Sequence, residues 1–155
     1  GKKGTLWFAI PQRDGKEVQI LHLYPKNVYL GAGCRKHTPK EKIETQIRTY
    51  LSEAGISITQ ILQAASIDLK KEEPGLLAFC EKYQIPFVTY SKEELERAKG
   101  TFTPSAFVSK ITGVDNVCER SASLSSDGGA FIMRKQAAEG VTAACTIKKW
   151  SVNFE

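Results

Sequence analysis

Residues 27–36 read NVYLGAGCRK and are the most informative stretch of the chain, because an apolar strand runs directly into two glycines, a thiol and a basic pair. Gly31 and Gly33 allow backbone angles that other residues avoid, and they let a ligand approach the main chain closely. We therefore expect a binding loop where this strand ends, with Cys34 and Arg35 at the entrance to the next helix.

The residues after this loop predict a helix over 39–54. Thr38 is the expected N-cap, Pro39 the first helical residue, and Glu41 completes a T-x-x-E capping box. Gly55 ends the helix. The free N–H groups of its first turn favour an anion close to the preceding loop.

Strands and helices alternate along the rest of the chain. This alternation predicts an α/β fold, a three-layer α/β/α arrangement with a mostly parallel sheet and an antiparallel C-terminal hairpin. The further predicted elements are, in order, a short helix begun by a Ser57/Gln60 capping box, a strand at 64–70, a helix from Pro74, a strand at 87–90, a helix begun by a Ser91/Glu94 capping box, helices at 104–111 and 117–124, and strands at 130–135 and 141–150.

The first 25 residues are predicted to lie outside this domain. LWFAI and EVQILHLY flank an Asp14-Gly15 turn signal, which predicts a hairpin. We interpret residues 1–25 as a linker or as the trailing hairpin of a missing upstream domain, and residues 26–155 as one α/β domain.

Composition excludes several classes of function. The 155 residues carry a formal net charge of +5, but the basic residues are scattered in pairs, which favours a small polyanion over nucleic acid. Four separated cysteines and two histidines, without C-x-x-C, predict a reduced cytoplasmic protein and no metal site. No apolar run is long enough to span a membrane.

Ligands of open α/β sheets bind beyond the carboxyl ends of the strands, and here those ends carry GAGCRK, SIDLKKEEPG and TYSKEE. The missing third glycine argues against a dinucleotide site. Arg35 is either a bidentate carboxylate ligand or a surface arginine paired with an acid. Cys34 is either an activated nucleophile or a small buried apolar residue.

Further candidates follow the later strands. Asp68 is a candidate acid or base and Lys70 a candidate carboxylate anchor. Thr103 and Ser105 belong first to a helix cap, and a ligand contact would be a second role. Glu119 lies in a short, weakly amphipathic helix, where we expect it to be exposed unless it transfers a proton.

Four segments, GAGCRK, ASIDLKKEEPGLL, TPSAFVSKITGVDNVCERSA and RKQAAEGVTAA, occur in this order between residues 27 and 147. Together they resemble the C-terminal domain of the cobalamin biosynthesis protein CbiG, the cobalt-precorrin 5A hydrolase family. Members of that family also carry an N-terminal domain, which the resemblance implies as a partner. A homodimer of this chain is a further possible partner arrangement, which the sequence leaves open.

The resemblance implies a step of the oxygen-independent route to cobalamin. The family enzyme opens the ring A lactone of a cobalt-bearing tetrapyrrole and releases acetaldehyde to give cobalt-precorrin 5B. The ligand carries acetate and propionate groups, which suit a basic protein, and it supplies the cobalt, so no cofactor is expected. The predicted catalytic residues are Asp68 and Glu119; the predicted substrate-binding residues are Gly31, Gly33, Cys34, Arg35, Lys36, Lys70, Thr103 and Ser105.

Two functions remain open at this point. The chain is either part of the hydrolase or a non-catalytic module that binds or carries corrinoid intermediates, as a stand-alone relative in the oxygen-dependent pathway is thought to do. Acetaldehyde release separates the two.

Overall fold

The computed structural model describes residues 6–11, 18–23, 26–104 and 113–148. At the start of the chain, β1 (Leu6–Pro11) and β2 (Val18–Leu23) pair antiparallel in a sheet of their own. The predicted hairpin strands are thus confirmed, whereas the Asp14-Gly15 turn lies outside the described residues. The domain boundary after residue 25 stays a prediction.

A mixed sheet of five strands forms the centre of the molecule, in the order β5-β4-β3-β7-β6. The three strands β3, β4 and β5 are parallel, while β7 runs antiparallel to both β3 and β6. The α/β prediction with an antiparallel C-terminal hairpin is confirmed. The strands are β3 (Val28–Cys34), β4 (Ile61–Ile67), β5 (Phe87–Tyr90), β6 (Phe131–Ala138) and β7 (Val141–Ile147).

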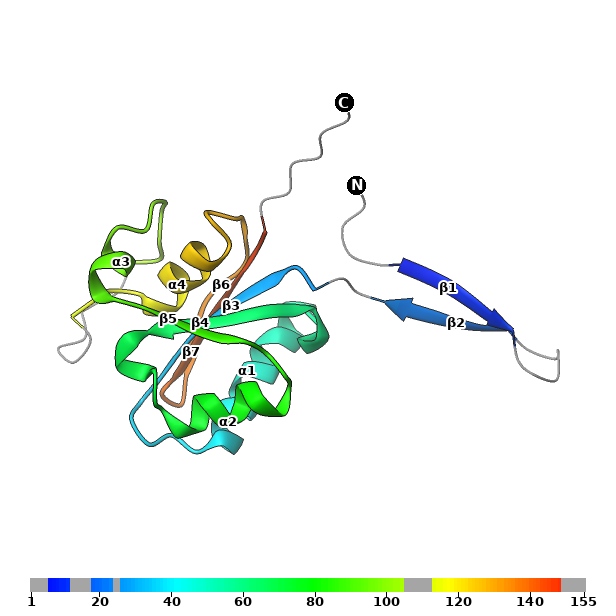
Figure 1. The fold of residues 1–155 in the computed structure, drawn as a ribbon, viewed down its shortest axis with the longest axis horizontal. Helices are drawn as coiled ribbons and strands as arrows, with labels where there is room; N and C mark the ends of the chain where they lie inside the picture. Colours follow the sequence, from blue (N-terminus) through cyan, green and yellow to red (C-terminus); the bar gives the residue numbers. More distant parts are fainter. Residues whose placement is uncertain (1–5, 12–17, 24–25, 105–112, 149–155) are drawn as a thin grey trace, which may run out of the picture.

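Helices cover both faces of this sheet (Figure 1). On one side lie α1 (Lys40–Glu53) and α2 (Pro74–Lys82), and on the other lie α3 (Lys92–Glu96) and α4 (Val117–Ser125). Two 3₁₀ helices flank β4: η1 (Ile58–Gln60) precedes it and η2 (Asp68–Lys70) follows it. The predicted helix over 104–111 lies, apart from Pro104, outside the described residues.

The main core lies between the sheet and the α1/α2 layer. One face of α1 is buried, with Ile43 and Ile47 fully enclosed against Leu30 of β3 and Phe79 of α2. Burying such side chains stabilises a fold by about 1.5–3 kcal/mol each. This packing fixes β3 and β4, and therefore the edge of the sheet at which they end.

The GAGC segment is strand rather than loop, which corrects the expectation of a glycine loop. β3 continues through Cys34 because β7 pairs with it along its whole length, with Gly31 opposite Ala144 and Gly33 opposite Thr142. Gly31 has a packing role: a Cβ there would lie 1.8 Å from the main-chain oxygen of Cys118. Only glycine lets α4 lie so close to β3.

The start of α1 also differs from the prediction. The Thr38 hydroxyl donates to the carbonyl of Arg35 at 2.6 Å, so it ties the loop to itself and does not cap the helix. The N-cap position is held by Pro39, without a side-chain hydrogen bond. The other two predicted capping boxes, at Ser57 and Ser91, are confirmed.

The predicted strand over 64–70 is shifted. β4 begins earlier, at Ile61, and ends at Ile67, because the chain turns into η2 with a hydrogen bond from Lys71 N–H to the Asp68 carbonyl. This turn brings Lys70 back over the edge of the sheet.

Candidate binding site at the carboxyl edge of the sheet

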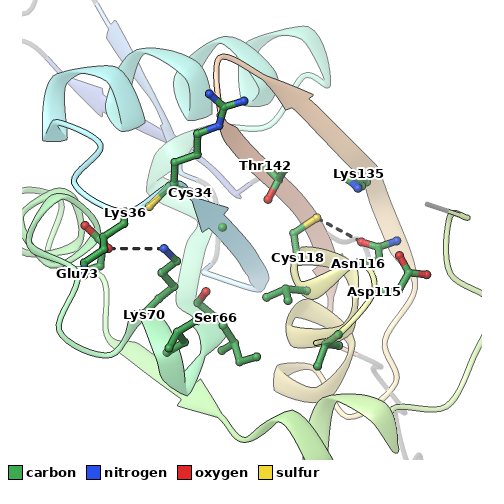
Figure 2. A pocket seen from close by; sticks show the side chains of 17 residues that line it. Cys34, Lys36, Ser66, Lys70, Glu73, Asp115, Asn116, Cys118, Lys135 and Thr142 are labelled. Carbon is green, nitrogen blue, oxygen red and sulfur yellow. Dashed lines mark hydrogen bonds and ion pairs between the residues drawn. The ribbon is translucent and has the colours of Figure 1, made fainter. Parts of the chain in front are cut away.

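A cavity of about 870 Å³ lies where β3 and β4 end (Figure 2). Ligand pockets in proteins usually enclose about 300–1,000 Å³, so this one suits a large ligand. Its walls come from the ends of β3 and β4, the start of α4 and the β6-β7 hairpin. The lining residues are Gly33, Cys34, Arg35, Lys36, Ser66, Ile67, Leu69, Lys70, Glu73, Val114, Asp115, Asn116, Val117, Cys118, Lys135, Gly140 and Thr142.

The β6-β7 turn fixes the start of the loop at residues 35–39, which follows β3 and is called the basic loop below. Glu139 and Gly140 both have positive φ, 55° and 76°, as a two-residue type I′ hairpin requires. The Arg35 N–H donates to the Gly140 carbonyl at 3.1 Å. The main chain of Arg35 is therefore held by secondary structure, while its side chain stays exposed.

The cavity carries net positive charge. Its basic side chains outnumber its acidic ones by four to two, the basic ones being Arg35, Lys36, Lys70 and Lys135 and the acidic ones Glu73 and Asp115. Positive charge in a partly enclosed cleft raises the local concentration of anions. The apolar part of the wall includes Ile67, Leu69, Val114 and Val117.

Glu73 joins two of the loops that form this cavity. Its Oε1 lies 3.6 Å from Lys70 Nζ, and these side chains are only 6% and 11% exposed. Its Oε2 accepts the main-chain N–H of His37 at 2.9 Å, where His37 has φ 67°. One buried carboxylate thus holds the lysine and the basic loop in fixed positions.

Cys34 lies on the cavity wall as a neutral thiol. Burial raises the pKa of the Cys34 thiol, an effect that the nearby charge of Lys70 only partly opposes. Since the thiolate is the nucleophilic form, this environment favours the interpretation of Cys34 as a small apolar wall residue.

The structure brings half of the predicted site residues together. Those that line the cavity are Gly33, Cys34, Arg35, Lys36 and Lys70. Ser105 lies outside the described residues. Gly31, Asp68, Thr103 and Glu119 are not part of the lining, so the catalytic roles of Asp68 and Glu119 stay predictions without support from the cavity.

Asp68 and Glu119 lie in opposite environments. Asp68 is exposed at the start of η2. Glu119 is fully buried, which corrects the expectation that it is exposed. It is buried because its carboxylate accepts hydrogen bonds from the N–H and hydroxyl of Thr103 at 2.7 and 2.6 Å and from the N–H of Lys135 at 2.7 Å. Glu119 thereby connects the 101–104 segment, α4 and β6.

Several lining residues were not predicted. Ser66 and Glu73 lie in the SIDLKKEEPG segment that the sequence had marked, but neither was named as a site residue. Asp115, Lys135 and Thr142 lie in two later segments that carry the family resemblance, TPSAFVSKITGVDNVCERSA and RKQAAEGVTAA, but no motif within those segments singled them out. Asp115 Oδ1 is buried without a hydrogen-bond partner among the described residues.

Among the described residues, no cluster of three or more histidine, cysteine, aspartate or glutamate side chains could hold a metal ion. None of the helices in this part of the chain has the length and apolar character needed to cross a bilayer.

The fold and the cavity define an α/β domain with a large, positively charged cavity at the carboxyl edge of its mixed sheet. The family model described as cobalamin synthesis G C-terminus matches residues 28–146. The chain belongs to this family.

Individual relatives agree with the family assignment. The chain is 35% identical over 123 residues to the cobalt-precorrin-5A hydrolase of Priestia megaterium, a match over 79% of this chain and 33% of the relative. It is 32% identical over 117 residues to protein CobE of a Sinorhizobium species, covering 74% of this chain and 76% of CobE. The chain thus spans about a third of the length of the hydrolase.

The fold also matches a solved structure. The crystal structure of CobE, a protein from the cobalamin (vitamin B12) biosynthetic pathway, superimposes with a TM-score of 0.71 at 26% identity. The match covers 79% of this chain and 91% of CobE. The domain described above therefore corresponds to nearly the whole of that protein.

Proposed function

We propose that this chain is the substrate-binding C-terminal domain of a cobalt-precorrin-5A hydrolase. The reaction opens the ring A lactone of cobalt-precorrin 5A and releases acetaldehyde to give cobalt-precorrin 5B. The cobalt arrives with the substrate, so the chain needs no cofactor of its own. An upstream domain of the same protein is the expected partner, and the expected compartment is the cytoplasm.

The observation that supports this function most directly is the cationic cavity at the sheet edge. A tetrapyrrole with several acetate and propionate groups presents an apolar ring surrounded by carboxylates. The cavity offers the matching surfaces, with Leu69 and Val117 as apolar wall and basic side chains on other sides. Charge-assisted bonds to carboxylates are about twice as strong as neutral ones, and arginine makes them bidentate.

The chemistry assigns different roles to the cavity residues. We infer that Arg35, Lys36 and Lys70 hold ligand carboxylates. Lactone opening adds water to a carbonyl group, so a base must accept a proton from that water and a donor must stabilise the oxygen that becomes negative. Among the described carboxylates of the lining, Asp115 is the better base because Glu73 is already paired.

Acetaldehyde release tests the proposed activity. The chain is incubated anaerobically with cobalt-precorrin 5A, and acetaldehyde is assayed. If the wild-type chain and Asp68→Asn release acetaldehyde and Asp115→Asn does not, the result supports both the hydrolase activity and the role of Asp115 as the base. Equal loss in Asp68→Asn would restore the original prediction for that residue.

Arg35→Ala tests the binding role of the cavity. The variant should bind the substrate more weakly by roughly 1.5–3 kcal/mol, about 10- to 150-fold, because a bond between two charged groups is lost. Arg97→Ala is the matched control, since Arg97 is exposed and lies outside the cavity lining. An unchanged affinity of Arg35→Ala would remove this residue from the site.

A second function has support from one comparison. The match covers 91% of the CobE chain, so the same domain can exist as a separate protein. The alternative function is therefore a module that binds or carries corrinoids without catalysis. Tight binding of cobalt-precorrin 5A without acetaldehyde release would favour this alternative. Absence of both binding and release would refute both proposals.

A further inference from the structure

A buried hydroxyl in the cavity is left without a partner. Ser66, near the end of β4, has 0% of its surface exposed and belongs to the cavity lining. Its Oγ has no hydrogen-bond partner among the described residues. Burying an unpaired hydroxyl costs free energy, so nearly all such groups in native structures are paired. The exception at Ser66 calls for a partner from outside the chain.

The neighbours of Ser66 do not supply that partner. Thr89 of β5 lies opposite in the sheet register, yet no hydrogen bond joins the two hydroxyls. The contrast with Ser121 of α4 is clear: Ser121 is equally buried, but its hydroxyl donates to the Val117 carbonyl at 2.7 Å. Figure 2 shows the Ser66 hydroxyl turned toward the space that the labelled side chains surround.

The surroundings of Ser66 suit an oxygen-bearing ligand group. Lys70 lines the same cavity and is held by Glu73, so its ammonium group is a second donor whose position is fixed. Cys34, a neutral thiol, completes this part of the wall. Two donors next to a weakly polar thiol favour an acceptor such as a carboxylate or a lactone carbonyl.

We propose that the Ser66 hydroxyl donates a hydrogen bond to a carboxylate or lactone oxygen of the bound corrinoid, beside the Lys70 ammonium. This inference rests on the proposed function and adds a binding residue to it. A site that holds a buried donor discriminates against ligands without the matching oxygen, because the donor is then left unpaired. Ser66 therefore contributes to the choice among corrinoids as well as to affinity.

Ser66→Ala tests this role, with Ser121→Ala as the matched control. Both variants remove one buried hydroxyl, but only Ser121 loses an existing bond. Affinity is measured by titrating each protein with cobyrinic acid, a cobalt corrinoid with free carboxylates, and stability by the midpoint of thermal unfolding. Ser66→Ala should bind about 10-fold more weakly while its midpoint stays equal or rises. Ser121→Ala should have a lower midpoint and nearly unchanged affinity.

Three results would count against the inference in different ways. Wild-type affinity in Ser66→Ala would overturn the role of the hydroxyl and leave the proposed function intact. If Ser66→Ala lowers the midpoint of thermal unfolding as much as Ser121→Ala does, the proposed role is also overturned, because the Ser66 hydroxyl would then stabilise the fold. Failure of the wild-type chain to bind cobyrinic acid would overturn the proposed function itself, and this inference with it.

Discussion

Replacing Glu119 by glutamine should destabilise the fold strongly. The carboxylate is fully buried, and two main-chain donors approach different oxygens: Thr103 N–H reaches Oε1 and Lys135 N–H reaches Oε2, both at 2.7 Å. A glutamine side chain can offer an oxygen to only one of them. Its amide nitrogen then faces the other donor, which is left unpaired in the interior.

The size of the effect follows from these contacts. A buried unpaired donor costs about 1–3 kcal/mol, and the remaining bonds lose about 0.5–1 kcal/mol with the charge. We therefore expect Glu119→Gln to lower the free energy of unfolding by about 1.5–4 kcal/mol. For a chain of this size the midpoint of thermal unfolding should fall by about 3–16 °C.

Urea denaturation followed by circular dichroism measures this loss. The matched control is Glu94→Gln, because Glu94 is exposed and a glutamine can keep its capping-box bond to the Ser91 N–H. The control should change stability by less than about 0.5 kcal/mol. A loss below about 1 kcal/mol in Glu119→Gln would show that the carboxylate does not join the 101–104 segment to α4 and β6.

The ionisation of Glu119 should also make the stability of the fold depend on pH. Burial acts to raise the pKa of the Glu119 carboxyl, but hydrogen bonds from Thr103 and Lys135 and the charge of Arg134 outweigh it and lower the pKa. The ionised carboxylate therefore stabilises the fold above the ordinary glutamate pKa of about 4.3. This stabilisation is lost as the pH falls through the lowered value. Glu119→Gln should lack this part of the acid unfolding transition.

Two further substitutions test the packing and the charge of the cavity. Gly31→Ala should cost about 3 kcal/mol or more in urea denaturation, because the new Cβ would lie 1.8 Å from the main-chain oxygen of Cys118 and must push α4 from β3. A change within 0.5 kcal/mol, the usual range at the surface, would contradict this packing. Glu73→Gln should bind cobyrinic acid about fivefold more weakly, because the neutral amide no longer pairs with the Lys70 ammonium and no longer fixes its position. Equal or tighter binding would contradict the role of Glu73 in positioning Lys70.

Local signals in the sequence were sufficient where an element depends on its own residues. Pro86 and Ser91 flank FVTY, and β5 is found at Phe87–Tyr90 as predicted. Capping boxes at Ser57 and Ser91 formed because all their hydrogen bonds lie within four residues. Charge and strand ends also located the basic half of the cavity.

Features that depend on distant parts of the chain could not be predicted in this way. β3 continues through Cys34 because β7, more than a hundred residues later, pairs with it. Glu119 is buried because Thr103 and Lys135 meet it from two other segments. Asp115 enters the cavity for the same reason, since its position depends on how α4 packs against β3 and β4.

We propose that one cationic cavity at the carboxyl edge of the sheet holds a carboxylated corrinoid. A crystal structure of the chain with cobyrinic acid bound would locate this ligand. We expect the macrocycle inside the cavity, with a carboxylate within hydrogen-bond distance of Arg35 or Lys70. A macrocycle bound elsewhere on the surface, with this cavity empty, would refute the proposed binding site.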